Sequence, residues 1–227
     1  MFFASQDTPP RAHCAFSLVE LLAGLAVLAI LALLLFPVLR SVRDHSAMTK
    51  SLGIVRQFQE ANSLYALDND GKYITVRTVD ENGRVKRWLD FYAYRQYLGI
   101  PYGGEWPLEL ISPNAGVLDE NGKPRHTRSY GMNTLGFDDW FNPGANYQAT
   151  MTSLEDPVST IAFADALDWI IADHGIKRYP GKEEYTKHAT AFRYNGKATV
   201  VFYDGHTGAY TMEEMLEHKN DWWNLHK

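Results

Sequence analysis

The sequence predicts an α+β fold in which one long N-terminal helix packs on an antiparallel β-sheet head. Three observations support this prediction. No charged residue occurs from Leu21 to Leu39, and apolar residues then recur at helical spacing as far as Tyr65. From Tyr73 onward the chain changes to short β-prone runs separated by turn-forming residues. The first two observations define the helix, and the third defines the head.

The composition excludes several classes of function. The 227-residue chain carries a formal net charge of -5, whereas nucleic-acid-binding domains usually present a basic face, so we expect no nucleic-acid partner. After the apolar segment roughly 190 residues remain, enough for one domain with a core. The single cysteine, Cys14, precedes that segment, so the rest of the chain offers no disulfide, thiolate metal site or cysteine nucleophile.

Residues 16–39 are predicted to form a transmembrane helix. The 19 uncharged residues from Leu21 to Leu39, at about 1.5 Å each, roughly match the hydrocarbon core of a bilayer. A secretory signal peptide has a shorter apolar core, about 7–15 residues, and a small-residue cleavage site, which residues 36–40 lack. An ordinary signal anchor is an alternative, in which Glu20 is incidental. A carboxylate in the first turns of such a helix is unfavourable and calls for a partner.

The segment around this glutamate resembles a known processing signal. Residues 15–22 read AFSLVELL, which is similar to the cleavage and methylation motif of type IV prepilins. The resemblance implies that residues 1–15 are a leader, that prepilin peptidase cuts between Ala15 and Phe16, and that the amine of Phe16 is then methylated. Glu20 is the fifth mature residue, as in that family. The family usually has glycine before the cut, where this chain has Ala15.

The motif has a physical rationale in subunit assembly. The amine of mature Phe16 lies four residues from Glu20, so the two groups share one face of a helix. A partly buried pair of opposite charges near 4 Å is worth on the order of 4 kcal/mol before desolvation. Pairing between Glu20 and the amine of a neighbouring subunit would set the axial register of a filament. We therefore expect Glu20 to act in assembly.

The charges that flank the apolar segment predict a membrane orientation opposite to the one that the prepilin motif requires. Arg40, Arg43 and Lys50 follow the segment, whereas Arg11 alone clearly precedes it. The positive-inside rule would place the C-terminal side in the cytoplasm. The prepilin motif requires the head to be periplasmic. We follow the motif because its residues match in type and register.

A second, amphipathic part of the helix is predicted at residues 40–67. One face is apolar, with positions Met48, Leu52, Ile54, Val55, Phe58, Ala61 and Tyr65. The other faces are assigned to Arg56, Gln57, Gln59, Glu60 and Asn62. This pattern predicts that the apolar side lies on the head.

Residues 68–71, DNDG, are predicted to end this helix in a turn. The longer segment 65–73 resembles the helix exit of type II secretion pseudopilins. Asp68 and Asp70 also suggest calcium, because alternate carboxylates suit a hard cation. The downstream glutamate of an EF-hand is absent, so the turn is preferred. We expect no metal site and no cofactor.

The head, residues 68–227, is predicted to be β-rich. Strands are expected at residues 73–79 and 85–89, joined by a turn at residues 80–83, and a short helix at residues 90–98. Residues 99–124 contain many glycines and prolines and are expected to form loops.

The end of the head resembles the bacterial pilin-like group whose heads end in an H-x9-DG motif. The resemblance rests on residues 129–133, 156–165 and 193–206, which include an Asn-Gly turn, an alternating strand and Asp204-Gly205-His206. Tyr194 stands where that motif has its histidine. No role that depends on that histidine is carried over to this chain.

Catalysis is not expected, although several side chains invite chemical interpretations. The acidic and histidine candidates are Asp165, Asp168, Asp173, His174, Asp204 and His206. No zinc-protease, serine-hydrolase or phosphate-loop spacing links them. Tryptophans could line a groove for carbohydrate or peptide, although they more often fill cores and interfaces. They are Trp88, Trp106, Trp140, Trp169, Trp222 and Trp223.

These features together predict a structural subunit of a type II secretion pseudopilus. The resemblance implies a single-pass protein of the bacterial inner membrane with a periplasmic head. The implied partners are prepilin peptidase, other pilin-like subunits, an inner-membrane assembly platform and the lipid bilayer. One alternative is a minor pilin for adhesion, motility or DNA uptake. Another is a membrane-anchored head that binds or hydrolyses a ligand.

Overall fold

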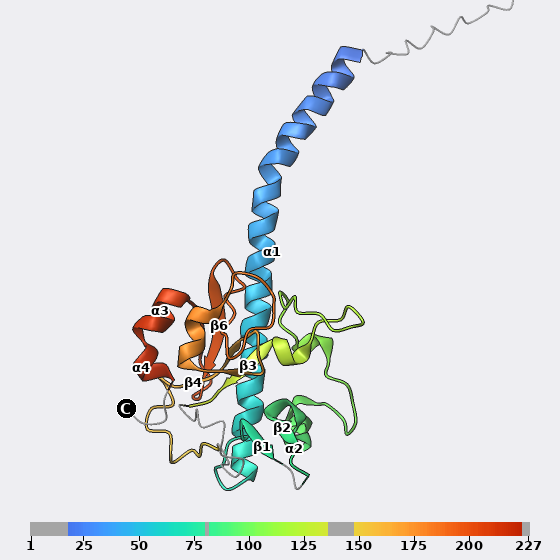
Figure 1. The fold of residues 1–227 in the computed structure, drawn as a ribbon. Coiled ribbons are helices and arrows are strands. Elements are labelled where there is room, and N and C mark those ends of the chain that lie inside the picture. The colour runs from blue at the N-terminus through green and yellow to red at the C-terminus, as the bar shows by residue number, and fades with distance from the viewer. Residues whose placement is uncertain (1–17, 80–81, 136–147, 224–227) are drawn as a thin grey trace, which may run out of the picture. The chain divides into compact units, whose positions relative to one another are not determined.

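The computed structural model describes residues 18–79, 82–135 and 148–223, without the side chains of residues 34–38 and 40 (Figure 1). It divides into two compact units, residues 1–43 and residues 44–227. Helix α1, Leu18–Asp68, contributes to both units. The unit at residues 44–227 is the head, and it holds every strand that the structure describes.

The head combines α1 with a five-stranded sheet, which confirms the predicted α+β fold. The strand order is β5-β3-β4-β6-β7. Neighbouring strands are antiparallel except β3 and β5, which are parallel. The strands are β3 (Tyr130–Asn133), β4 (Ile161–Asp165), β5 (Ile170–Ile171), β6 (Lys197–Phe202) and β7 (Thr207–Thr211).

A separate antiparallel pair, β1 (Arg77–Val79) and β2 (Val85–Arg87), forms the predicted hairpin. Its strands are shorter than expected. The single helix predicted at residues 90–98 is also wrong in detail, because the segment forms three short pieces. These are the 3-10 helix η1 (Trp88–Asp90), helix α2 (Tyr92–Arg95) and the 3-10 helix η2 (Gln96–Leu98).

The remaining helical elements are short. They are the 3-10 helices η3 (Leu108–Leu110), η4 (His126–Arg128) and η5 (Asp173–Arg178), and the helices α3 (Met212–Glu217) and α4 (Lys219–Trp222). Thr211 caps α3, since its hydroxyl accepts the N–H of Glu214 and the Glu214 carboxylate accepts the N–H of Thr211. This reciprocal capping box fixes where α3 begins.

The predicted apolar face of α1 packs in the core of the head, as expected. Ile54, Val55, Phe58 and Ala61 are all buried. They share one cluster with side chains of β3 and β4. The ring of Phe58 makes edge contacts with Tyr130 and Trp88, at centroid distances of 5.3 and 5.6 Å. Edge-to-face packing of this kind adds to the benefit of burial alone.

Two polar side chains of α1 lie on this buried face rather than on the solvent-exposed faces where the sequence pattern placed them. The Gln59 amide donates to the carbonyl of Tyr203 at 2.7 Å, and the Asn62 amide donates to the side chain of Gln59 at 3.0 Å. The Asn62 side-chain oxygen in turn accepts the N–H of Ile74 at 2.9 Å. The two residues are tolerated inside because these bonds replace water.

Both faces of the large sheet are covered. Phe163 and Val201 belong to the cluster that contains α1. Ala164 and Val200 belong to a second cluster, which includes Trp223 and side chains of η5 and α3. The pairing of β4 with β6 shifts register between Ile161 and Phe163, which is a β-bulge. The bulge shifts the alternation of side chains by one residue. Phe163 and Asp165 therefore lie on the face of the sheet that packs against α1.

Candidate functional site

Of the three residues predicted to act in processing and assembly, the structure describes one. The cleavage pair Ala15–Phe16 lies outside the described residues. Glu20 lies in the first turn of α1 and is exposed to solvent. Its proposed partner, the amine of mature Phe16, is created only by processing.

The part of α1 around and after Glu20 exposes a large apolar surface. From Leu18 to Leu33 the large aliphatic side chains are between 50% and 77% exposed. Such a surface is unfavourable in water, and contiguous apolar surface of this size marks an interaction site. Among the residues that the structure describes, no helix has both the length and the apolarity needed to cross a bilayer.

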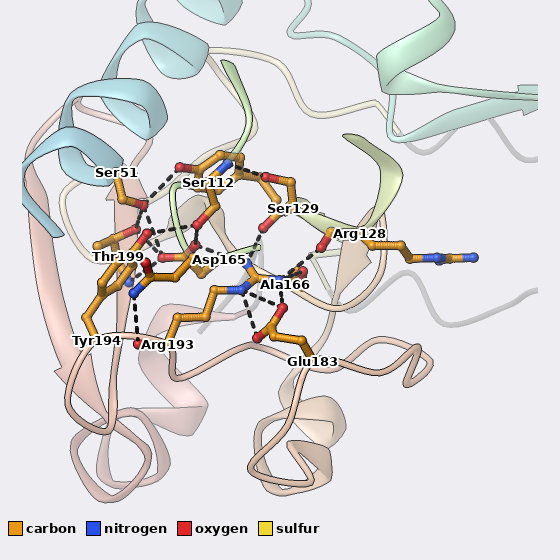
Figure 2. A network of polar contacts seen from close by, with 12 residues as sticks. Ser51, Ser112, Arg128, Ser129, Asp165, Ala166, Glu183, Arg193, Tyr194 and Thr199 are labelled. Atoms are coloured by element: carbon orange, nitrogen blue, oxygen red, sulfur yellow. Dashed lines mark hydrogen bonds and ion pairs between the residues drawn. The ribbon is translucent and has the colours of Figure 1, made fainter. Parts of the chain in front are cut away.

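The head contains a buried polar network centred on Asp165, which is completely inaccessible to solvent (Figure 2). One carboxylate oxygen of Asp165 accepts the hydroxyl of Ser112 at 2.8 Å and a guanidinium N–H of Arg193 at 3.1 Å. The other accepts the N–H of Thr199 at 3.0 Å, the Thr199 hydroxyl, and the Ser51 hydroxyl at 3.3 Å. Ser51 is on α1 and Thr199 on β6, so one carboxylate connects the helix to two strands.

Arg193 compensates this buried charge, and each of its five N–H groups has an acceptor. Besides Asp165, the guanidinium donates to the carboxylate of Glu183 at 3.0 Å. The remaining donors bind backbone carbonyls of Arg128, Ser129 and Ala166 at 2.6 to 2.9 Å (Figure 2). The guanidinium thereby joins three chain segments.

The electrostatics of this pair reflect burial and pairing together. Burial raises the pKa of Asp165, while Arg193, Thr199 and Ser112 stabilise the charged carboxylate and oppose that rise. Burial disfavours the charge on Arg193, but the pKa of this guanidinium is raised overall because Asp165 and Glu183 lie against it. Removing either partner would leave the charge of the other unpaired in the interior, which would strongly destabilise the folded head.

Tyr194, at the position of the histidine in the H-x9-DG pattern, is a member of this network. Its hydroxyl lies 2.8 Å from the Ser112 hydroxyl, which in turn binds Asp165. Burial, and then the charge of Asp165, raises the pKa of Tyr194. The phenol is therefore neutral and acts as a hydrogen-bonding group.

The candidate catalytic groups do not form a common site. Asp204 and His206 bind each other at 2.6 Å in the turn after β6. Asp168 instead pairs with Arg128 and accepts the N–H of His188. Within the described part of the chain, no three His, Cys, Asp or Glu side chains are placed to hold a metal ion. At the exit of α1, Asp68 accepts the hydroxyl of Tyr97 at 2.6 Å.

His174 forms a pair with His188 instead of a catalytic arrangement. His174 Nε2 lies 2.9 Å from His188 Nδ1, so one imidazole donates and the other accepts. His188 is buried and has a positive φ of 61°. The close approach of η5 depends on Gly175, because a Cβ atom there would lie 1.8 Å from the carbonyl oxygen of His188.

Comparison with known proteins identifies the N-terminal segment. Residues 10–36 match the prokaryotic N-terminal methylation motif. This match contains Ala15, Phe16 and Glu20, and it supports a type IV pilin-like protein, whose subunits are processed by prepilin peptidase and assemble with one another. No curated protein and no solved structure matches the chain. The match does not extend into the head, so the H-x9-DG resemblance remains a prediction.

Sequence reasoning found the methylation motif but missed the centre of the head. The sequence indicates Asp165 only as a candidate acid and as the last residue of the segment 156–165, and Ser51 and Ser112 lie in no recognisable pattern. Of the six tryptophans, Trp88 and Trp223 are buried in the core, and Trp140 lies outside the described residues. The sequence shows Arg193 only as a cation two residues before the Asn-Gly turn, and this position alone does not predict that Arg193 pairs with Asp165.

Arg193→Met tests whether the head depends on the buried ion pair. Removing the guanidinium leaves Asp165 without its cation, so we expect the free energy of unfolding to fall by about 3–5 kcal/mol. The measurement is urea unfolding of the full chain in detergent, with tryptophan fluorescence as the signal of unfolding. The matched control is Arg178→Met, because Arg178 is exposed and donates only a 3.3 Å bond to Lys187. Equal losses in both variants would contradict this role.

Acid should destabilise the head through the histidine pair. Burial, together with the charges of His174, Lys187 and Arg178, lowers the pKa of His188 to about 4. The unfolded chain therefore binds a proton first as the pH falls. Between pH of about 6.5 and 4 the free energy of unfolding should decrease by about 3 kcal/mol from this residue.

His188→Asn should remove this part of the pH dependence, since asparagine tolerates a positive φ. The matched control is His45→Asn, which changes an exposed histidine on α1. Urea unfolding at several pH values gives the free energy of unfolding as a function of pH, and the slope of this dependence is compared between the two variants and the original protein. An unchanged slope in His188→Asn would show that the pair is not responsible.

Proposed function

We propose that this chain is a structural subunit of a type II secretion pseudopilus. The observation that carries the proposal is the methylation motif, with Glu20 in the first turn of a helix whose aliphatic side chains are exposed. Such a helix needs a surrounding of lipid or of other helices. Before assembly the inner membrane supplies the lipid. In the filament, a core made of like helices supplies the helix contacts.

Processing comes first in the proposed mechanism. Prepilin peptidase cuts between Ala15 and Phe16 and methylates the new amine. Residues 16–39 hold the chain in the bacterial inner membrane as a single span, with the head in the periplasm. The inner-membrane assembly platform then moves the helix into the filament, where Glu20 pairs with the Phe16 amine of a neighbouring subunit. Chemical turnover is not part of this role.

The head contributes a compact outer domain attached to the same helix. Ser51, Gln59 and Asn62 of α1 each bind a group of the head through buried hydrogen bonds. These bonds attach the helix to the head at three points, of which the bond of Ser51 reaches strand β4. The helix exit at residues 65–73 resembles that of secretion pseudopilins, which favours a role in secretion over one in a pilus.

The mature N-terminus tests the proposal directly. The full chain is expressed in cells with an active prepilin peptidase, and the N-terminal peptide is analysed by mass spectrometry. We expect the peptide to begin at Phe16 and to carry one methyl group on its amine. Retention of residues 1–15 would overturn the proposal. A control in cells without the peptidase should retain them.

Glu20→Ala tests the assembly role separately from cleavage. We expect normal cleavage after Ala15 but at least a roughly ten-fold loss of subunit in sheared filaments, because a charge partner worth about 1.4 kcal/mol or more is removed. The matched control is Glu60→Ala, which removes an exposed carboxylate from the head half of α1. Filament incorporation of Glu20→Ala at the level of the control would refute the role.

A further inference from the structure

A pocket of about 520 Å³ lies in the head, away from the N-terminal motif. It is lined by the end of β2, by η1 and α2, and by the two loops around residues 104–111 and 119–126. A volume of this size falls within the range of small-molecule sites, roughly 300–1,000 Å³. The role in a filament makes no use of it.

The charges around the pocket cancel. Arg87 and Asp90 form a two-point ion pair, with N–O distances of 2.8 and 3.1 Å. Of the other charged lining residues, Arg95 and Lys123 are positive, and Glu105 and Asp119 are negative. Burial, followed by the charge of Arg87, lowers the pKa of His126, so this imidazole is neutral at pH 7. The pocket therefore has no excess charge that would favour an anion or a cation.

Part of the lining is apolar and aromatic. The ring of Trp106 stacks on His126, with a centroid distance of 5.6 Å and an angle of 17° between the planes. Leu108, Ile111 and Pro124 also line the pocket. An apolar wall beside charged groups suits a ligand that has both a hydrocarbon face and polar substituents.

The polar part of the lining is held in place before any ligand arrives. The Asp119 carboxylate accepts the N–H groups of Asn121 and Lys123 at 2.8 and 2.9 Å, which fixes that loop. Arg95 donates to the carbonyl of Gly104, which fixes the opposite loop. The Nε atom of Arg95 has no hydrogen-bond acceptor among the residues that the structure describes. Preorganised donors and acceptors reduce the entropic cost of binding.

We propose that this pocket binds a neutral saccharide of about one or two sugar units. Sugar hydroxyls both donate and accept hydrogen bonds, so they satisfy carboxylates, amides and cationic donors in one site. The C–H face of a sugar ring matches the wall formed by Trp106, Leu108 and Ile111. A phosphate or a nucleic acid would require excess positive charge, and a lipid tail would leave the polar lining groups unsatisfied.

Saturation-transfer NMR on the full chain tests the proposal. The protein is kept in a polyoxyethylene detergent, which has no sugar headgroup. The neutral probes are maltose, cellobiose and di-N-acetylchitobiose, and digalacturonate is the charged probe. We expect saturation transfer to the ring C–H protons of at least one neutral disaccharide, and weaker transfer to digalacturonate. No transfer to any neutral probe, or a preference for digalacturonate, would overturn the proposal.

Two variants place the binding in the pocket. Glu105→Ala and Lys123→Ala each remove one charged hydrogen-bonding group, so we expect roughly ten-fold weaker binding from each. The matched controls are Glu109→Ala and Lys86→Ala, which remove exposed groups outside the lining. All four residues are exposed, so the variants should unfold at the same urea concentration as the original protein. Equal binding by variants and controls would refute the site.

The inference does not rest on the proposed function. If Phe16 is N-methylated but no sugar binds, the proposal of a saccharide site is refuted and the proposed function is supported. An unprocessed chain that binds cellobiose through Glu105 and Lys123 would remove only the assignment to a filament.

Discussion

The head depends on one electrostatic constraint, the burial of Asp165 at the end of β4. A carboxylate without access to solvent must be compensated by hydrogen bonds and an opposite charge. The hydroxyls of Ser51, Ser112 and Thr199 and the guanidinium of Arg193 supply these (Figure 2). Because these groups come from α1, a loop, β6 and the segment before β6, the charge can be satisfied only when all four are in place. The network thus requires the helix and the sheet to be assembled together.

Helix α1 meets two opposite requirements along its length. In the head, its apolar face is buried against β3 and β4, and its polar groups are paired inside. Between Leu18 and Leu33 it exposes aliphatic side chains. An apolar surface of this extent is typical of a segment that contacts lipid or other protein chains. The methylation motif at residues 10–36 lies on this part of the chain, so the processing signal and the uncovered surface coincide.

Much of the fold could be predicted from the sequence because its signals are local. The apolar spacing on α1, the hairpin of β1 and β2, and strand β6 after the Asn-Gly turn all follow from short patterns. The burial of Gln59 and Asn62 could not be predicted, because their partners, Tyr203 and Ile74, are set by tertiary structure. The same holds for Asp165, whose partners Ser51, Ser112 and Thr199 lie far away in sequence. The parallel pairing of β5 with β3 also depends on a distant contact.

The β-bulge in β4 determines on which side of the sheet the charge of Asp165 falls. Since side chains alternate along a strand, one residue more or less reverses the side of everything that follows. Ile161 and Ala164 lie in the same cluster although they are three positions apart, because the bulge absorbs one residue between them. A regular strand would direct Asp165 toward Met215 and Trp223, where the cluster is apolar. A single irregular peptide in β4 therefore decides whether the acid meets its arginine or a hydrocarbon surface.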